Sequence, residues 1–282
     1  MEFLKSARKS WKPGLLFICF CVIVLALIFK FYAGERQLNG LLVDLELKSP
    51  DPSRHTELKD ALTRRLTAEA PSLGNIKLNL SYVHFSDLNT NFFDSTRVHF
   101  IILSPQSTPW SRYRGAELPK LESAEQILRE LILKRNMPVL GICGGHQFLA
   151  LAFGGAVDFI DPSIVGSAPE RYPSDALSER GPVWLQVLVD DPILEGVARR
   201  PDKFRAIESH YEEVKTAPAP FINLARSELS EVQLIRIPGK LVYGMAFHPE
   251  RGWDGEPETA STEGKQILAN FFRMVARDNG IY

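Results

Sequence analysis

Cysteine is scarce in this sequence, and neither sign of charge is in excess. There are three cysteines in 282 residues, and 33 basic residues are balanced by 34 acidic ones. Cys19 and Cys21 lie within one apolar run and Cys143 has no partner, so we expect no disulfide framework. The near-neutral charge gives no basic footprint for nucleic acid, and we expect no nucleic-acid partner. The sequence also contains no phosphate-binding glycine loop, metal-ligand cluster or cofactor motif, so we expect neither a metal nor a cofactor.

The longest apolar run covers residues 14–33. Residues 14–29 carry no charge, and the aliphatic stem of Lys30 can lie along the membrane while its ammonium reaches the surface. The run is close to the roughly 20 residues that a helix needs to cross a bilayer. We therefore predict a basic tail over residues 1–13, a transmembrane helix over residues 14–33, a linker over residues 34–37 and one soluble domain over residues 38–282.

A cleaved signal peptide is the alternative for this run, because basic residues also precede it. A cleavage site ending at Ala33 would need a small residue where Phe31 stands, which favours the uncleaved anchor. The basic residues before the run are Lys5, Arg8, Lys9 and Lys12, and those after it are Lys30 and Arg36. The positive-inside rule then predicts that the soluble domain lies outside the cytoplasm.

Segments typical of strands and of helices alternate along the soluble part. The expected strands are 41–47, 76–83, 98–103, 139–142, 183–189 and 234–237, and the expected helices are 55–70 and 122–136. The segment 162–181, rich in Pro, Ser and Glu, is either a lid over a substrate or a disordered surface loop. The alternation predicts an α/β domain with a doubly wound, mostly parallel sheet, whose active site lies at the carboxyl ends of the strands.

Cys143 stands between a short apolar strand and a helix. Residues 139–142 fit a buried central strand, and residues 148–152 continue as a helix that two glycines end. The unpaired N–H groups and the positive dipole end at a helix N-terminus favour a thiolate, so Cys143 is a candidate nucleophile. Gly144 could donate its backbone N–H to a developing oxyanion. This stretch alone is equally compatible with a small cysteine buried in the core.

A second apolar strand, residues 241–247, is followed by His248 and Glu250. A thiol nucleophile needs an imidazole to take its proton and later to protonate the leaving amine. That imidazole needs a third group to fix its tautomer. His248 and Glu250 would supply these two roles to Cys143.

The class I glutamine amidotransferase superfamily, which has a flavodoxin-like fold, is similar to this chain at two motifs. The motifs are Gly141-Ile142-Cys143-Gly144-Gly145-His146-Gln147 and Phe247-His248-Pro249-Glu250, and further similar segments are 153–157, 191–197, 208–214, 221–227 and 264–272. The resemblance implies that Cys143 attacks the side-chain amide of glutamine, forms a γ-glutamyl thioester and releases ammonia. It also implies that His248 is the base, with Glu250 as its orienter. Gln147 would then help to hold the substrate, and Gly144 would donate to the oxyanion.

Two positions depart from the pattern of this family. The family usually has a Ser-Gly-Gly-Pro turn after the third strand, where this chain has Ser104-Pro105-Gln106-Ser107-Thr108. Pro105 has no N–H to donate, so Gln106 would have to supply the second oxyanion donor. In Ser209-His210-Tyr211, Tyr211 stands where relatives often have a small residue beside the amino-acid end of the substrate. Both departures predict an altered substrate pocket, to which Ser209 and Tyr211 contribute.

The sequence leaves three functions open. The first is a membrane-anchored amidase that hydrolyses glutamine or another γ-glutamyl amide through a thioester on Cys143. The second is an inactive binding or scaffold module on the same fold, which Pro105 and Tyr211 favour. The third is another cysteine hydrolase with a differently placed histidine, for which His146 is the candidate. Because the amidase-like domain fills the length after the anchor, the first function also predicts a separate ammonia-accepting synthase as partner.

Overall fold

The computed structural model describes residues 36–47, 60, 64, 76–95, 97–113, 115, 117–251 and 262–281. The chain divides into a unit of residues 1–36 and a compact unit of residues 37–282, which carries the fold. The predicted tail and transmembrane helix lie outside the described residues, as does most of the predicted helix 55–70. Within the described ranges, no helix combines the length and the apolar character needed to span a bilayer.

Nine strands form one sheet, in the order β2-β1-β3-β4-β11-β10-β9-β6-β7. The innermost strands β3 and β4 consist of buried residues only, as expected for strands that are covered on both faces. The bounds are β1 Arg36–Asp44, β2 Ile76–His84, β3 Phe100–Leu103, β4 Val139–Ile142, β6 Glu179–Val187, β7 Lys203–His210, β9 Ile222–Arg226, β10 Leu234–Arg236 and β11 Val242–Met245. Two further strands, β5 Val157–Phe159 and β8 Glu212–Val214, pair with each other in a small second sheet.

The large sheet is parallel in its centre and antiparallel along one side. The pairs β1 with β3, β3 with β4 and β4 with β11 are parallel. From β11 outward, the pairs with β10, β9, β6 and β7 are antiparallel. The predicted α/β class is confirmed, but the expectation of a mostly parallel sheet holds only for the centre. The difference arises because consecutive strands such as β10 and β11 are joined by a tight turn, and such a turn can join only antiparallel neighbours.

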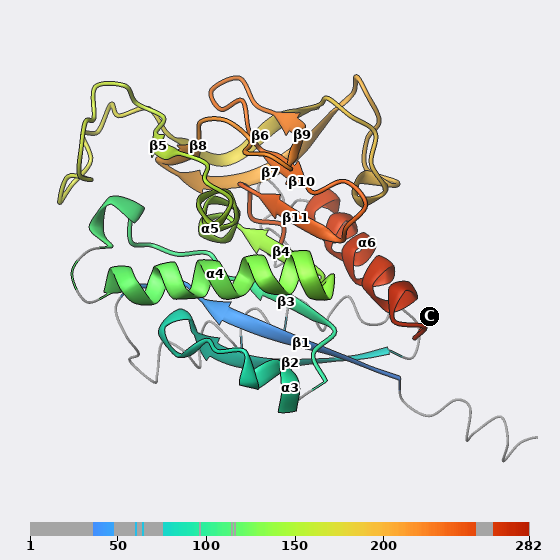
Figure 1. Cartoon of the computed structure of the whole chain (residues 1–282). Helices are drawn as coiled ribbons and strands as arrows, with labels where there is room; N and C mark the ends of the chain where they lie inside the picture. Colours follow the sequence, from blue (N-terminus) through green and yellow to red (C-terminus); the bar gives the residue numbers. More distant parts are fainter. Residues whose placement is uncertain are drawn as a thin grey trace, which may run out of the picture. The chain divides into compact units, whose positions relative to one another are not determined.

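Helices cover both faces of the sheet (Figure 1). Helices α4 (Glu117–Arg135) and α5 (Gly144–Ala152) pack on one face, where strand side chains such as Ile101 and Val139 meet them. Helix α6 (Thr262–Asp278) packs on the other face, against alternate side chains such as Ile102 and Leu140. The short helix α3 comprises Asn91–Ser95. These two apolar cores show that the sheet is doubly wound, which places a site at the carboxyl ends of its parallel strands.

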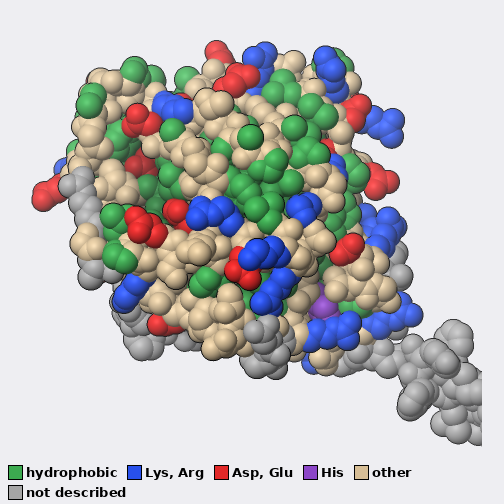
Figure 2. Space-filling view, in the orientation of Figure 1, with side chains coloured by type: hydrophobic (Ala, Val, Ile, Leu, Met, Phe, Trp, Pro, Cys, Tyr) green, Lys and Arg blue, Asp and Glu red, His purple; other side chains and the backbone are tan. Residues whose placement is uncertain are grey.

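The outer face of α4 is charged with both signs. Arg129 lies 4.0 Å from Glu125, and Lys134 lies 3.7 Å from Glu130, each pair one helical turn apart. Figure 2 shows Lys and Arg side chains interspersed with Asp and Glu side chains on this face of the domain.

Candidate active site

Cys143 occupies a sharp turn between β4 and α5. Its backbone has φ 50° and ψ −105°, a conformation that L-residues adopt at a cost of about 1–3 kcal/mol. The flanking glycines make this turn possible: a Cβ on Gly145 would lie 2.4 Å from the carbonyl oxygen of Leu103, and one on Gly141 would lie 2.4 Å from that of Gly145. The Cys143 N–H donates to the Met245 carbonyl of β11 at 2.8 Å. The predicted strand, turn and helix around Cys143 are confirmed.

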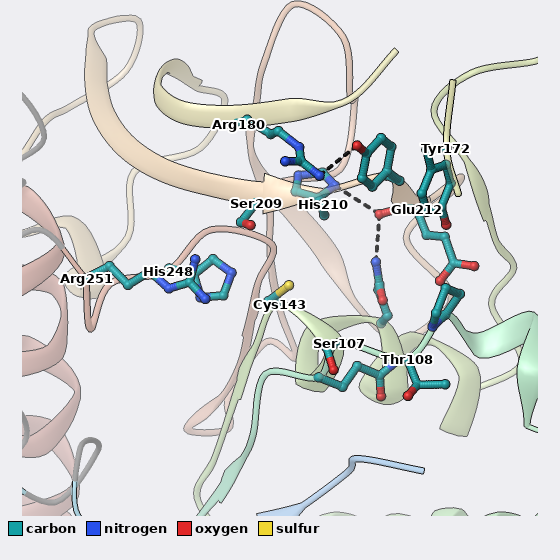
Figure 3. A pocket seen from close by; sticks show the side chains of 14 residues that line it. Ser107, Thr108, Cys143, Tyr172, Arg180, Ser209, His210, Glu212, His248 and Arg251 are labelled. Atoms are coloured by element: carbon teal, nitrogen blue, oxygen red, sulfur yellow. Dashed lines mark hydrogen bonds between the residues drawn. The ribbon is translucent and has the colours of Figure 1, made fainter. Parts of the chain in front are cut away.

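His248 and Glu250 follow β11 and form a buried pair. Nδ1 of His248 lies 2.8 Å from Oε1 of Glu250, which fixes the ring so that Nε2 is the nitrogen left for chemistry. Nε2 is buried, and the His248 ring interacts with the Cys143 side chain. Cys143 and His248 line one cavity and lie side by side in Figure 3. The structure therefore brings together the three residues that the sequence predicted.

Electrostatics in this cavity favour a thiolate and an imidazolium. Burial raises the pKa of the Cys143 thiol, but the neighbouring His248 and His210 together lower it more, so that the pKa lies below its usual value. Burial lowers the pKa of His248, but Glu250 and Cys143 oppose this effect and raise it to about 10. Burial likewise raises the pKa of Glu250, and His248 brings it below its usual value. The three side chains thus favour alternating charges, with a thiolate beside an imidazolium and a carboxylate, which is the state a cysteine nucleophile needs.

The cavity has a volume of about 300 Å³. The residues predicted from the sequence that line it are Gln106, Cys143, Gln147, Ser209, Tyr211 and His248. Lining residues that the sequence interpretation did not assign to the site are Ser107, Thr108, Pro109, Tyr172, Arg180, His210, Glu212 and Arg251. Tyr172 and Arg180 belong to the segment 162–181, for which the sequence left a substrate lid and a disordered surface loop open, and both residues line the cavity.

Gln147 is buried in α5, four residues after Cys143, and its side-chain amide is bonded at both ends. Its Nε2 donates to the Glu212 carbonyl at 2.7 Å, and its Oε1 accepts from Nε1 of Trp110 at 2.8 Å. These bonds fasten α5 to β8 and to the loop before α4. That Gln147 also holds a substrate stays a prediction.

Gly144 and Gln106 lie against each other, where the predicted oxyanion donors should be. A Cβ on Gly144 would lie 3.1 Å from the backbone nitrogen of Gln106 and 2.5 Å from its Cγ, so only glycine allows this approach. The backbone N–H groups of both residues are therefore close to Cys143. That Gln106 replaces the glycine of the family turn as the second donor stays a prediction, and this proximity supports it.

A buried glutamate from the end of β1 holds this loop in place. Oε2 of Glu46 accepts hydrogen bonds from the Ser107 N–H at 2.8 Å and from the Ser107 hydroxyl at 2.7 Å. Oε1 of Glu46 accepts from the Thr108 hydroxyl. Glu46 is itself oriented by its own N–H, which donates to Asp44 at 2.9 Å. The sequence interpretation did not assign Glu46 to the site. Its position directly after a parallel strand could have indicated it, because sites in such sheets lie at the carboxyl ends of the strands.

Replacing Glu46 by alanine should lower kcat for amide hydrolysis about 10- to 100-fold, because the loop that carries Gln106 loses its three bonds and the donor shifts. Glu46→Gln keeps the shape and an acceptor oxygen, so it should recover most of that loss. Steady-state kinetics on both variants, with thermal unfolding to confirm the fold, measure the effect. Equal kcat in wild type and Glu46→Ala would contradict this role.

His146, the candidate histidine of the third function that the sequence left open, lies outside the cavity. It is buried, its ring lies against Gly244, where a Cβ would be 2.9 Å from Nδ1, and it does not line the cavity. Burial lowers the pKa of His146 to about 3, so it stays neutral. The absent Cβ of Gly244 makes room for the ring, which lies outside the cavity that Cys143 faces.

His210 is a cavity histidine that the sequence interpretation passed over. Its Nε2 lies 3.0 Å from Oε2 of Glu208 and 3.2 Å from Oε2 of Glu179, and its Nδ1 donates to the Glu212 carbonyl at 2.9 Å. Burial lowers the pKa of His210, but Glu208 and Glu179 outweigh this and raise it well above its usual value. The buried imidazolium contributes a second positive charge near Cys143 and counters part of the thiol's burial.

A cysteine at a strand-to-helix turn of a doubly wound sheet, beside a buried His–Glu pair, is an arrangement suited to a cysteine nucleophile with its base. Residues 58–275 match the family described as glutamine amidotransferase class-I. The chain therefore belongs to the class I glutamine amidotransferase family.

Individual relatives agree with this assignment. The chain is 30% identical to a glutamine-hydrolyzing GMP synthase subunit from Methanosarcina barkeri over 188 residues, which cover 67% of this chain and 84% of the relative. It is 35% identical over 161 residues to the protein of the same name from Pyrococcus abyssi, covering 57% of this chain and 71% of the relative.

Solved structures show the same fold. The crystal structure of a protein described as a GMP synthase subunit from Thermoplasma acidophilum has a TM-score of 0.58 and 24% identity, and the match covers 86% of this chain and 96% of that one. A glutamine amidotransferase from Thermotoga maritima has a TM-score of 0.55 and 18% identity, covering 86% and 97%. At these identities the likeness concerns the fold alone.

Proposed function

We propose that this protein hydrolyses the side-chain amide of glutamine, or of another γ-glutamyl compound, through a thioester on Cys143. The observation that carries the proposal is the buried group of Cys143, His248 and Glu250 at the carboxyl ends of β4 and β11, open to a cavity of about 300 Å³. The relatives from Methanosarcina and Pyrococcus are described as glutamine-hydrolyzing, which supports glutamine as the substrate.

The proposed first half-reaction forms the thioester. The Cys143 thiolate attacks the amide carbon, and a C–S bond forms while the carbonyl oxygen becomes an oxyanion beside the Gly144 and Gln106 N–H groups. The C–N bond then breaks as the His248 imidazolium passes its proton to the leaving nitrogen, which departs as ammonia. His248 is left neutral, and Glu250 keeps its ring oriented.

The proposed second half-reaction restores the enzyme. Water attacks the thioester carbon and gives its proton to neutral His248. The C–S bond breaks, which releases glutamate and returns Cys143 as a thiolate beside a protonated His248. Because each of these relatives is described as one part of a synthase, we also propose that a separate partner accepts the ammonia.

The test of this function is covalent labelling of the full-length protein with a glutamine-mimicking diazoketone, followed by intact-mass analysis. We expect one adduct per chain, none in Cys143→Ala, and ammonia release from glutamine by the wild type. If the diazoketone leaves the protein unmodified while iodoacetamide still alkylates Cys143, the cavity does not accept glutamine, and the binding-module alternative takes its place.

The apolar run 14–33 supports a second, separate proposal, that the chain is anchored in a membrane with its domain outside the cytoplasm. The expected result is that the full-length protein stays with the membrane fraction after alkaline carbonate washing. A reporter enzyme that is active only outside the cytoplasm, fused after Tyr282, should then be active. Release into the supernatant would contradict the anchor, and a silent reporter would contradict the predicted side.

A further inference from the structure

One wall of the cavity is a stack of two tyrosines and an arginine. The rings of Tyr172 and Tyr211 are parallel within 3°, with centroids 3.8 Å apart. The guanidinium of Arg180 lies 4.6 Å from the centroid of the Tyr211 ring, and its Nη2 donates to the Tyr211 hydroxyl at 2.7 Å. Figure 3 places Tyr172 on the side of Cys143 away from His248, with Arg180 along the upper edge of the cavity in that view.

Tyr211 holds the Arg180 side chain in place, but no acidic side chain among the described residues pairs with it. It directly follows buried Glu179 in β6, and its backbone is opposite Ser209 on β7. Among the described residues it forms no ion pair, and the hydrogen bond from its Nη2 goes to a neutral phenol. A guanidinium has five N–H donors, so most of them remain for a ligand. An arginine that is ordered by stacking, lines a cavity and has no acidic partner is complementary to a carboxylate.

Glu212 provides the opposite charge in the same cavity. One of its carboxylate oxygens accepts a hydrogen bond from the Trp110 N–H at 3.1 Å, and its side chain lines the cavity on the Tyr172 side in Figure 3. Burial raises the pKa of Glu212 to about 7, so an arriving ammonium group would favour the ionised form. The far side of the cavity from His248 therefore presents one cation and one ionisable carboxyl, the complement of an α-amino acid's two charges.

We infer that Arg180, braced by Tyr211 and Tyr172, binds the free α-carboxylate of the γ-glutamyl substrate, and that Glu212 binds its α-ammonium group. This inference rests on the proposed function and names the part of the substrate that the cavity selects. It also gives a reason for Tyr211, which stands where relatives often have a small residue: the ring is the platform on which the guanidinium rests. The amide end of the substrate then faces Cys143 and His248.

The experiment compares three amides that differ only at the end away from the reacting group. Glutamine has both the α-carboxylate and the α-amino group, glutaramate lacks the amino group, and 4-aminobutanamide lacks the carboxylate. In Arg180→Met, kcat/KM should fall about 10- to 100-fold for glutamine and for glutaramate, mainly through KM. For 4-aminobutanamide, kcat/KM should stay within about twofold of the wild-type value, because this substrate has no carboxylate for Arg180 to bind.

Matched variants complete the design. Glu212→Gln should show the converse pattern, with losses for glutamine and 4-aminobutanamide and little change for glutaramate. Arg180→Lys should recover part of the loss with both carboxylate-bearing amides. Arg171→Met removes an exposed arginine beside Tyr172 that does not line the cavity, and it should leave all three rates unchanged.

An equal loss with all three amides in Arg180→Met would overturn the inference, because Arg180 would then act on the fold or on the chemistry. Unchanged glutamine hydrolysis in Arg180→Met would overturn it too, while leaving the proposed function intact. A wild type that hydrolyses none of the amides and takes no diazoketone adduct would overturn the proposed function and this inference with it. The two failures are therefore distinguishable.

Discussion

Replacing Cys143 by alanine is expected to lower the rate of glutamine hydrolysis by about 10⁴-fold or more. Alanine removes the sulfur that forms the thioester, and the aliphatic hydroxyls that line the cavity, on Ser107, Thr108 and Ser209, are far weaker nucleophiles than a thiolate. The exchange deletes a single buried atom, so the free energy of unfolding should change by only about 1–2 kcal/mol. Ammonia release, measured beside a denaturant titration, separates the lost chemistry from lost stability.

The other two cysteines provide the control for this experiment. Cys19 and Cys21 belong to the apolar run 14–33, so the Cys19→Ala, Cys21→Ala double variant should hydrolyse glutamine at the wild-type rate. Substantial turnover in Cys143→Ala would show that the reaction proceeds without the thioester. A rate lost in the double variant instead would place the nucleophile elsewhere.

The proposed catalytic residues could be predicted because the patterns that mark them are local in the sequence. Cys143 lies at a strand-to-helix turn whose glycines are its immediate neighbours, and His248 and Glu250 are two residues apart at the end of one strand. A doubly wound sheet brings the carboxyl ends of parallel strands to one edge. The register of Gly141 with Gly244 then sets both motifs on adjacent strands, as the pattern required.

The roles of Glu46 and Arg180 at the cavity could not be predicted, because they depend on contacts between distant segments. Glu46 holds Ser107 across 61 positions, and Arg180 reaches Tyr211 across 31. In a single sequence these residues are only a glutamate after a strand and an arginine in a polar segment, and both residue types are common on protein surfaces. Only the fold shows that these side chains converge around the cavity that Cys143 faces.

The antiparallel side of the sheet was predicted only in part, for a different reason. The expected strands 183–189 and 234–237 correspond to β6 and β10, but β7 and β9 were not predicted, and the five residues of β9 are too few for an alternating pattern to be distinguished from a loop. The places of β9 and β10 in the sheet are fixed by the turns and by pairing with β11 and β6. Consequently the pairing that sets Arg180 on β6 opposite Ser209 on β7 could not be derived from the sequence.

Replacing His248 by asparagine is expected to lower glutamine hydrolysis about 10²- to 10⁴-fold and to raise the pKa of the Cys143 thiol. In the wild type the imidazolium, together with His210, outweighs the burial that would raise this pKa. Without the imidazolium, burial is opposed mainly by His210, and less thiolate is present at pH 7. Glu250→Gln should move the pKa in the same direction by less, because it lowers the pKa of His248 without removing the ring.

The measurement is the rate of iodoacetamide alkylation of Cys143 as a function of pH, followed by mass spectrometry. In the wild type, reactive thiolate should already be present below the ordinary cysteine pKa, and glutamine hydrolysis should fall as the pH rises past about 10, where His248 loses the proton that the leaving amine needs. In His248→Asn the alkylation midpoint should move to higher pH.

His99→Asn is the control, since His99 lies just before β3, at the end of the sheet opposite Cys143. Its asparagine side chain can still accept the hydrogen bond that the Asn39 N–H donates to Nδ1 in the wild type. An alkylation profile that is the same in wild type and His248→Asn would show that His248 does not set the charge of the nucleophile. The lowered pKa would then have to come from His210 and the positive end of α5, the remaining positive groups at Cys143.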